Sequence, residues 1–135
     1  MSRSLSEAQL IYNWNLKGRR SSLAPGLRFL DETLRDGIQG PSIADPKLSD
    51  KIRILELEEA LGIDSIDLGL PGAGSRAVAD VEALAREIVN QGMKIQPSCA
   101  ARTHVNDIRP IVEISQRVGI EIEVLAFLGT SPIRQ

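Results

Sequence analysis

The stretch LDETLRDGIQ, residues 30–39, restricts the fold of this chain more than any other. Apolar residues including Leu27 and Phe29 lead into it, and glycines and a proline follow it, so we predict a β-strand that runs out into a loop. Arg35 and Asp36 stand at the end of that strand. A guanidinium suits a carboxylate or an enolate-like oxygen, and a carboxylate suits a divalent cation. An ordinary ion pair explains the same two residues, and their types alone favour it.

Strands and helices alternate along the rest of the chain, at the period of about 30 residues that a βα unit takes. We expect strands to start near Leu27, Ile63, Met93 and Ile120. This order predicts a parallel sheet with right-handed crossovers. A doubly wound open sheet fits the same pattern. However, no Gly-x-Gly-x-x-Gly follows the first strand and no Walker lysine motif occurs, which counts against nucleotide-binding folds.

Three helices are expected between these strands. Ser49 or Asp50 is a suitable cap for the first, which ends at Leu61, and Ser75 is a suitable cap for the second. Pro110 is tolerable in the third helix if it lies in the first turn. The first helix carries two apolar stripes, which suits a helix with neighbours on both sides: Leu48, Ile52 and Leu55, and Ile54, Leu57 and Leu61.

Ligands of parallel α/β proteins bind beyond the carboxyl ends of the strands. The residues that this rule collects from the four expected strands are Arg35, Asp36 and Gln39, then Asp67 and Gly69, then Ser98 and Cys99, and finally Thr130 and Ser131. These side chains are the candidates for a functional site.

Other residues of these loops have simpler explanations. The glycines around Pro71 resemble a phosphate-binding loop, but the change from loop to helix explains them better. Arg76 and Arg102 suit a phosphate or a carboxylate, although exposed arginines at helix starts are commoner. Cys99 has no evident base beside it, so we expect a small buried residue rather than a nucleophile. His104, the single histidine, is expected at the start of the third helix rather than on a metal.

The composition excludes several classes of function. A net charge of −2 provides no basic field for nucleic acid or an anionic membrane. The single cysteine excludes an internal disulfide and is too few for a thiolate metal site. No apolar run approaches the length that spans a membrane. With 42% apolar and 25% charged residues, we expect a soluble protein of the cytoplasm.

The chain divides into an N-terminal arm, residues 1–26, and one domain, residues 27–135. The arm is rich in serine and arginine and has one acidic residue, Glu7. That composition is also found in organellar import signals, which we keep as the alternative to an ordinary arm.

Three segments resemble one enzyme superfamily. DETLRDGIQ at residues 31–39 is similar to the strand-one signature of the isopropylmalate synthase, homocitrate synthase and hydroxymethylglutaryl-CoA lyase superfamily. IDSIDLGLP at residues 63–71 and LGTSPI at residues 128–133 fall where that family has its strand-two and strand-four segments. The resemblance, strongest to isopropylmalate synthase, implies a (β/α)₈ TIM barrel. A complete barrel takes about 250 residues, so we expect one truncated after its fourth strand.

The resemblance also implies an activity, the condensation of an acyl-CoA with a 2-oxo acid on a divalent metal (Mg²⁺, Mn²⁺ or Zn²⁺) in amino-acid biosynthesis. The acyl-CoA that we expect is acetyl-CoA. Asp36 matches the metal-ligand aspartate, and Arg35 matches the arginine that stabilises the enolate or alkoxide. Gln39 and Thr130 match substrate-side positions. Asp67, where relatives often have Glu, is either a hydrogen-bond acceptor behind the site or a polar residue of the barrel mouth. The family also implies a homodimer.

Two departures leave the function open. The family completes its metal site with a His-x-His pair, which this chain lacks, so we expect the chain alone to be inactive. Leu125 stands close to where the synthases carry a histidine, which puts the leucine-pathway substrate in doubt. A lyase or aldolase that cleaves a carbon–carbon bond is one alternative. The other is a half-barrel without catalytic activity that serves in assembly and self-associates through its open strand edges.

Overall fold

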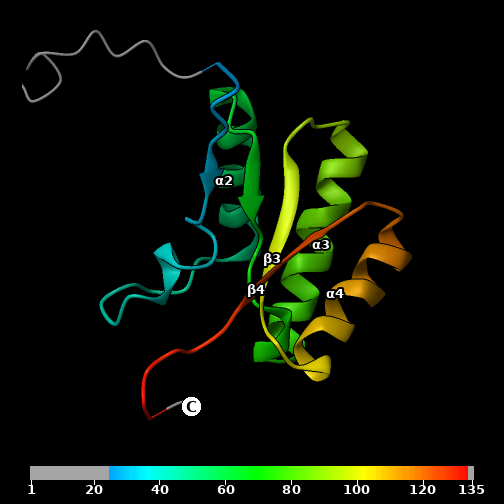
Figure 1. Cartoon of the computed structure of the whole chain (residues 1–135). Helices are drawn as coiled ribbons and strands as arrows, with labels where there is room; N and C mark the ends of the chain where they lie inside the picture. The colour runs from blue at the N-terminus through cyan, green and yellow to red at the C-terminus, as the bar shows by residue number, and fades with distance from the viewer. Residues whose placement is uncertain (1–24, 134–135) are drawn as a thin grey trace, which may run out of the picture.

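The structure, a computed structural model, describes residues 25–133. The expected N-terminal arm, residues 1–26, therefore lies outside the described residues except for its last two positions. Four strands form one parallel sheet in the order β1-β2-β3-β4 (Figure 1). Their bounds are Leu30–Asp31 for β1, Ser65–Asp67 for β2, Gln96–Arg102 for β3 and Glu123–Phe127 for β4. The sheet does not close on itself, so the fold is the α/β arrangement of the first four units of a barrel.

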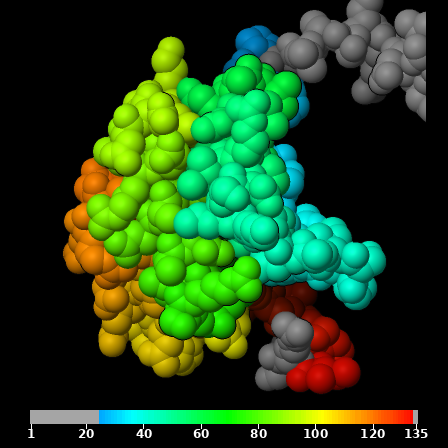
Figure 2. All heavy atoms as spheres, turned by 180° about the vertical axis from the view of Figure 1, so that it is seen from behind, coloured from blue at the N-terminus to red at the C-terminus, as the bar shows by residue number. Residues whose placement is uncertain are grey.

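Each strand is followed by a helical segment before the next strand begins. The long helices are α2 (Leu48–Leu61), α3 (Ser75–Gln91) and α4 (Val105–Val118). Two short 3₁₀ helices, η2 (Gly37–Gln39) and η3 (Pro71–Ala73), lie in the loops after β1 and β2. Seen from behind, the side chains of α2 and α3 cover the sheet (Figure 2). Within the described residues, no helix combines the length and the apolar character needed to span a lipid bilayer.

The core lies between the sheet and the long helices. Successive side chains of a strand point to opposite faces, so only alternate strand residues reach it. Its buried members are Leu55, Val81, Leu84, Ala85, Ile88, Ile111 and Ile114 from the helices, and Ile66, Cys99 and Ala101 from the strands, with Leu34, Leu68, Ile95 and Ile122 from the adjoining loops. Burial of these side chains is the main force that holds α2, α3 and α4 on the sheet.

The opposite face of the sheet carries the intervening residues. The register pairs Asp67 of β2 with Ser98 of β3, and Ser98 with Glu123 of β4. One step nearer the carboxyl ends, Ala100 pairs with Leu125. We call this side of the sheet the open face. In a closed barrel it would line the interior.

The strands begin later than the sequence suggests, because side-chain carboxylates accept hydrogen bonds from the backbone N–H groups that precede them. The third strand begins at Gln96 and not near Met93. The reason is that the Glu59 carboxylate accepts the N–H groups of Lys94 (3.0 Å) and Ile95 (2.9 Å), which are then not paired in the sheet. Likewise, the N–H of Phe29 donates to the Asp64 carboxylate at 2.7 Å, ahead of β1.

The helix starts also differ from expectation. Neither Ser49, Asp50 nor Ser75 caps a helix: α2 follows Lys47 and α3 follows Gly74, both without a side-chain cap bond. Helix α4 begins directly after His104, whose Nδ1 accepts the N–H of Asn106 at 3.1 Å. This confirms the helix-start position of His104. Pro110 lies beyond the first turn of α4, so the condition under which the sequence analysis tolerates it is not met.

The buried residues of helix α2 lie on one of its faces. Leu55 is fully buried, whereas Leu57 and Leu61 are exposed. The other buried residues of α2 are charged, Lys51 and Glu58, and they lie on the same face as Leu55. Ile52 and Ile54, one from each apolar stripe, are partly buried and pack against the core. The expectation of neighbours on both sides is therefore met only in part among the described residues.

Candidate functional site

The side chain of Asp67 is the centre of a hydrogen-bonded group at the carboxyl end of β2. It is completely buried, and its Oδ2 accepts a hydrogen bond of 2.9 Å from Nε of Arg35. Its Oδ1 accepts the backbone N–H groups of Gly69 (3.0 Å) and Ala100 (3.3 Å). Asp67 thus ties the loop after β1 to the ends of β2 and β3.

The guanidinium of Arg35 contacts two more carboxylates. Its Nη2 lies 2.5 Å from Oε2 of Glu32, and its Nη1 lies 3.0 Å from Oδ1 of Asp36. Burial opposes the charge of Arg35, but the hydrogen bond and the charge of Asp67 outweigh it and raise the pKa of the guanidinium. Arg35 therefore stays charged and is held in one orientation by three partners from two segments of the chain.

The pKa of Asp67 shifts in the direction expected for a buried acid. Burial raises the pKa of this carboxyl, and the hydrogen bonds from Gly69 and Arg35 oppose the rise. The nearby guanidinium supplies the compensating charge that a buried carboxylate needs. Both oxygens of Asp67 are occupied by bonds within the protein, so its observed role is to hold Arg35 in place.

The other site candidates are more exposed. Asp36 has two thirds of its side chain exposed, and Gln39, at the end of η2, is also exposed. Thr130 lies beyond the end of β4 and is exposed as well. In Figure 1 the loop after β1 and the segment after β4 both lie at the lower end of the sheet. Within residues 25–133, no hydrogen bond joins Thr130 to Arg35 or to Asp36.

Strand β3 brings different residues to this edge than the sequence suggests. Ser98 and Cys99 lie in the middle of β3, because the strand continues to Arg102. Ser98 donates its hydroxyl to the carbonyl of Ile66 at 2.9 Å and is buried. Cys99 is buried too, as predicted, and burial raises the pKa of its thiol. Both residues are structural.

Arg102 ends β3 and pairs with a neighbour. Its Nε lies 2.6 Å from Oδ2 of Asp107, and its Nη2 lies 2.8 Å from Oδ1 of the same carboxylate. This fork-like pair links the strand end to the first turn of α4. Asp107 also approaches Gly72 so closely that a Cβ there would lie 2.7 Å from Cγ of Asp107. The glycine is therefore explained by packing and not by phosphate binding.

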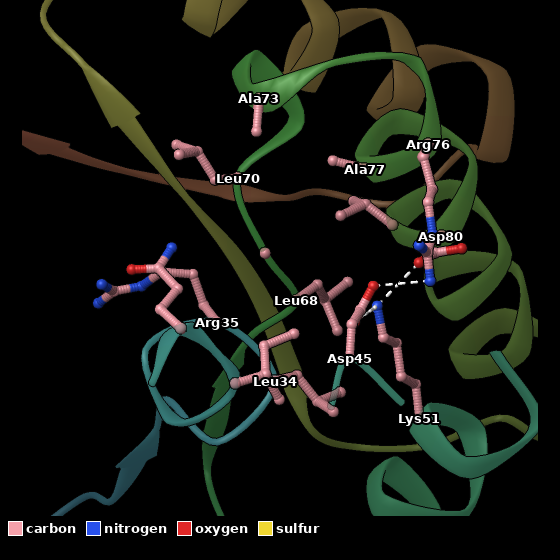
Figure 3. A pocket seen from close by; sticks show the side chains of 14 residues that line it. Leu34, Arg35, Asp45, Lys51, Leu68, Leu70, Ala73, Arg76, Ala77 and Asp80 are labelled. Carbon is pink, nitrogen blue, oxygen red and sulfur yellow. Dashed lines mark hydrogen bonds and ion pairs between the residues drawn. The ribbon is translucent and has the colours of Figure 1, made fainter. Parts of the chain in front are cut away.

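A pocket of about 310 Å³ opens beside Arg35, between the loop after β1 and the start of α3 (Figure 3). Arg35 stands at one side of it, and the opposite side carries a charged cluster. Apolar side chains separate the two, among them Leu34 and Leu68.

We call Lys51, Asp45, Asp80 and Arg76 the Lys51 cluster. Nζ of Lys51 lies 2.8 Å from Oδ2 of Asp80 and 3.0 Å from Oδ1 of Asp45. Arg76 Nη2 lies 2.6 Å from the other oxygen of Asp45. Lys51 was not among the predicted site residues, although a lysine one turn before Leu55, on the stripe that also carries Leu48 and Ile52, was a usable signal.

Asp36, the residue expected as a metal ligand, does not belong to a complete metal site within the described residues. Asp36 has the exposed carboxylate that such an ion prefers. However, residues 25–133 contain no group of three or more His, Cys, Asp and Glu side chains that could hold an ion. A metal at Asp36 would need further ligands from outside this part of the chain.

The fold and the site together define a parallel α/β protein of the barrel type, with a fixed arginine and an exposed aspartate at the carboxyl ends of its strands. The chain belongs to the HMGL-like family, whose model matches residues 26–134.

Curated relatives agree with this assignment. The chain is 32% identical over 108 residues to the 2-isopropylmalate synthase of Nitratidesulfovibrio vulgaris, an alignment that covers 79% of this chain and 20% of the relative. It is 36% identical over 107 residues to the 2-isopropylmalate synthase of Acidimicrobium ferrooxidans, covering 78% and 19%. The corresponding enzyme of Nitrosomonas eutropha is 33% identical over 107 residues, covering 79% and 20%. The chain thus spans about a fifth of the length of these relatives.

Proposed function

We propose that these residues form the part of an acyl-CoA:2-oxo acid condensing enzyme that carries the reactive arginine. The observation that supports this is the geometry around Arg35, which is held by Asp67 at the carboxyl ends of the strands and adjoins the exposed Asp36. A fixed, charged guanidinium can stabilise the negative oxygen that forms during carbon–carbon bond formation. In this proposal acetyl-CoA and a 2-oxo acid are the substrates.

The roles of the remaining candidates follow from their positions. Asp36 would supply one carboxylate ligand to a divalent metal, which polarises the carbonyl of an oxo acid when it is bound. Gln39 and Thr130 are proposed as substrate contacts, since both are exposed near strand ends. Asp67 is proposed as a positioning residue for Arg35, since both its oxygens are already in use.

Leu125 supports a substrate with an apolar part. It lies on the open face in register with Ala100, whose N–H donates to Asp67. Leu125 thus shares the open face of the sheet with Asp67, and an aliphatic side chain there suits the side chain of an oxo acid better than a polar group would. The same position leaves room for the alternative, a lyase that cleaves a hydroxymethylglutaryl-CoA or a 4-hydroxy-2-oxo acid.

The test uses the longest polypeptide encoded in frame with these 135 residues. Release of free CoA thiol from acetyl-CoA is followed with 2-oxo acids that have small, aliphatic and acidic side chains. We expect metal-dependent release with at least one of them, and a loss of about 100-fold or more in kcat for Arg35→Lys. Arg53→Lys is the matched control, because Arg53 is exposed on α2 and, within residues 25–133, pairs only with the neighbouring Glu56.

The outcomes separate the alternatives. Cleavage of hydroxymethylglutaryl-CoA without any condensation would favour the lyase. If neither reaction occurs and Arg35→Lys changes nothing, the proposal is wrong. In that case sedimentation of the 135-residue chain becomes the informative measurement. The half-barrel hypothesis predicts self-association through the open edges, where Phe29 and Phe127 are about half exposed.

A further inference from the structure

The Lys51 cluster presents two cations to a single carboxylate. Lys51 contacts one oxygen of Asp45, and Arg76 contacts the other. This is the arrangement of a carboxylate-binding site, with each oxygen accepting from a different cation. The carboxylate that fills it here comes from the loop between η2 and α2.

The two halves of the cluster differ in burial. Lys51 is buried, and its partner Asp80 is mostly covered. Asp45 is 43% exposed and Arg76 is 70% exposed, so the contacts of Asp45 are screened by water. Exposed pairs of this kind contribute little to stability. The Asp45 carboxylate can therefore move away from Lys51 and Arg76 into solvent. Lys51 keeps Asp80 as its partner, so no buried charge is left unpaired.

The space next to the cluster is apolar and large enough for a small molecule. The pocket has a volume of about 310 Å³, at the lower end of the range for ligand sites. Figure 3 shows Leu68 and Ala77 on the walls that separate the cluster from Arg35. A ligand with a carboxylate at one end and a short aliphatic chain at the other matches both parts of this surface.

We propose that the pocket between the loop after β1 and the start of α3 binds a small aliphatic carboxylate, and that Asp45 occupies the carboxylate position when no ligand is bound. The ligand carboxylate accepts from Lys51 and Arg76, and its aliphatic chain lies against the apolar wall. Asp45 moves out with its loop, which begins only a few residues after Gln39. Ligand binding here is thus linked to the segment that carries Arg35. The proposal does not depend on the condensation reaction.

The experiment titrates the 135-residue chain with sodium 3-methylbutanoate and follows the backbone amides by NMR. The neutral probe 3-methylbutanamide, of the same shape, is titrated in parallel. We expect saturable shifts at residues 43–47 and 74–78 with the acid, and none that saturate with the amide. Asp45→Asn, which removes the internal competitor, should tighten binding by up to about fivefold. Arg76→Ala should weaken it by a similar factor.

Arg53→Ala is the matched control for loss of a positive charge, and it should leave the affinity unchanged. Asp45 and Arg76 are exposed, so both substitutions keep the core, and a thermal melt of each variant verifies this. The proposal is overturned if the acid gives no saturable shifts. It is also overturned if the amide binds equally well, or if Asp45→Asn does not bind more tightly than the unaltered chain. Shifts confined to Arg35 and Asp36 would locate the acid in the other site and equally overturn it.

Discussion

Nε of Arg35 donates a 2.9 Å hydrogen bond to Oδ2 of Asp67, a side chain that is fully buried although it is ionisable. The two residues are 32 positions apart in the sequence. Their pairing joins the signature loop after β1 to the neighbouring strand, and it determines where the guanidinium points.

Asp67→Asn should lower the free energy of unfolding by about 3 kcal/mol, because it leaves the Arg35 guanidinium without its buried partner. The measurement is urea denaturation at neutral pH. Asp36→Asn is the control, since Asp36 is the exposed partner of the same arginine, and it should cost less than about 1 kcal/mol. Equal losses for the two variants would show that burial of Asp67 does not matter to the pair.

Glu58 should make the chain less stable as the pH rises. Burial and the neighbouring Asp31 raise the pKa of Glu58 from 4.5 to about 8, and one of its carboxyl oxygens has no hydrogen-bond partner. Between these pH values the folded chain holds a proton that the unfolded chain has lost. The stability contributed by that proton is complete below pH 4.5 and is lost as the pH rises to about 8.

The test compares denaturation at pH 5 and pH 8. The unaltered chain should lose about 2 kcal/mol or more over this interval, and Glu58→Gln should lose clearly less. Glu113→Gln, an exposed carboxylate of α4, should leave the pH dependence unchanged. The same slope in all three proteins would contradict the assignment to Glu58.

Gly72→Ala should destabilise the fold by about 2 kcal/mol, since its Cβ would lie 2.7 Å from Cγ and 2.8 Å from Oδ1 of Asp107. Asp107 cannot move away easily, because Arg102 holds both of its oxygens. In Gly37→Ala, by contrast, the nearest contact is 3.7 Å, so that variant should be within about 1 kcal/mol of the unaltered chain. Thermal melts of the two variants measure the difference, and equal stabilities would contradict the predicted clash at Gly72.

Cys99 should react with a thiol reagent only when the chain unfolds. It is fully buried, and burial raises the pKa of its thiol, so little thiolate is available. In a Cys99→Ala background, Ser131→Cys introduces an exposed thiol that should react at once. Fast reaction of Cys99 in the native chain would show that β3 opens locally far more readily than its packing indicates.

The sequence by itself determined the class of fold. The alternation of apolar strands with helical segments predicts parallel strands joined by helices, and the structure has them in consecutive order. The resemblance of residues 31–39 to a known signature pointed to the family that the comparison then identified. Both are local patterns, read from residues close together in the chain. The burial of Cys99 and the position of His104 at a helix start were predicted in the same way.

Only the tertiary structure decided the boundaries and the partners. The start of β3 depends on Glu59, which takes up two backbone N–H groups 35 and 36 residues away. The role of Asp67 depends on its pairing with Arg35. The charge of the buried Lys51 is balanced by Asp45 and Asp80, which come from two other segments. These contacts join residues far apart in sequence, so no periodicity reports them. For Asp67 and Lys51 the reason is that a buried charge must find a partner wherever the folded chain brings one within reach.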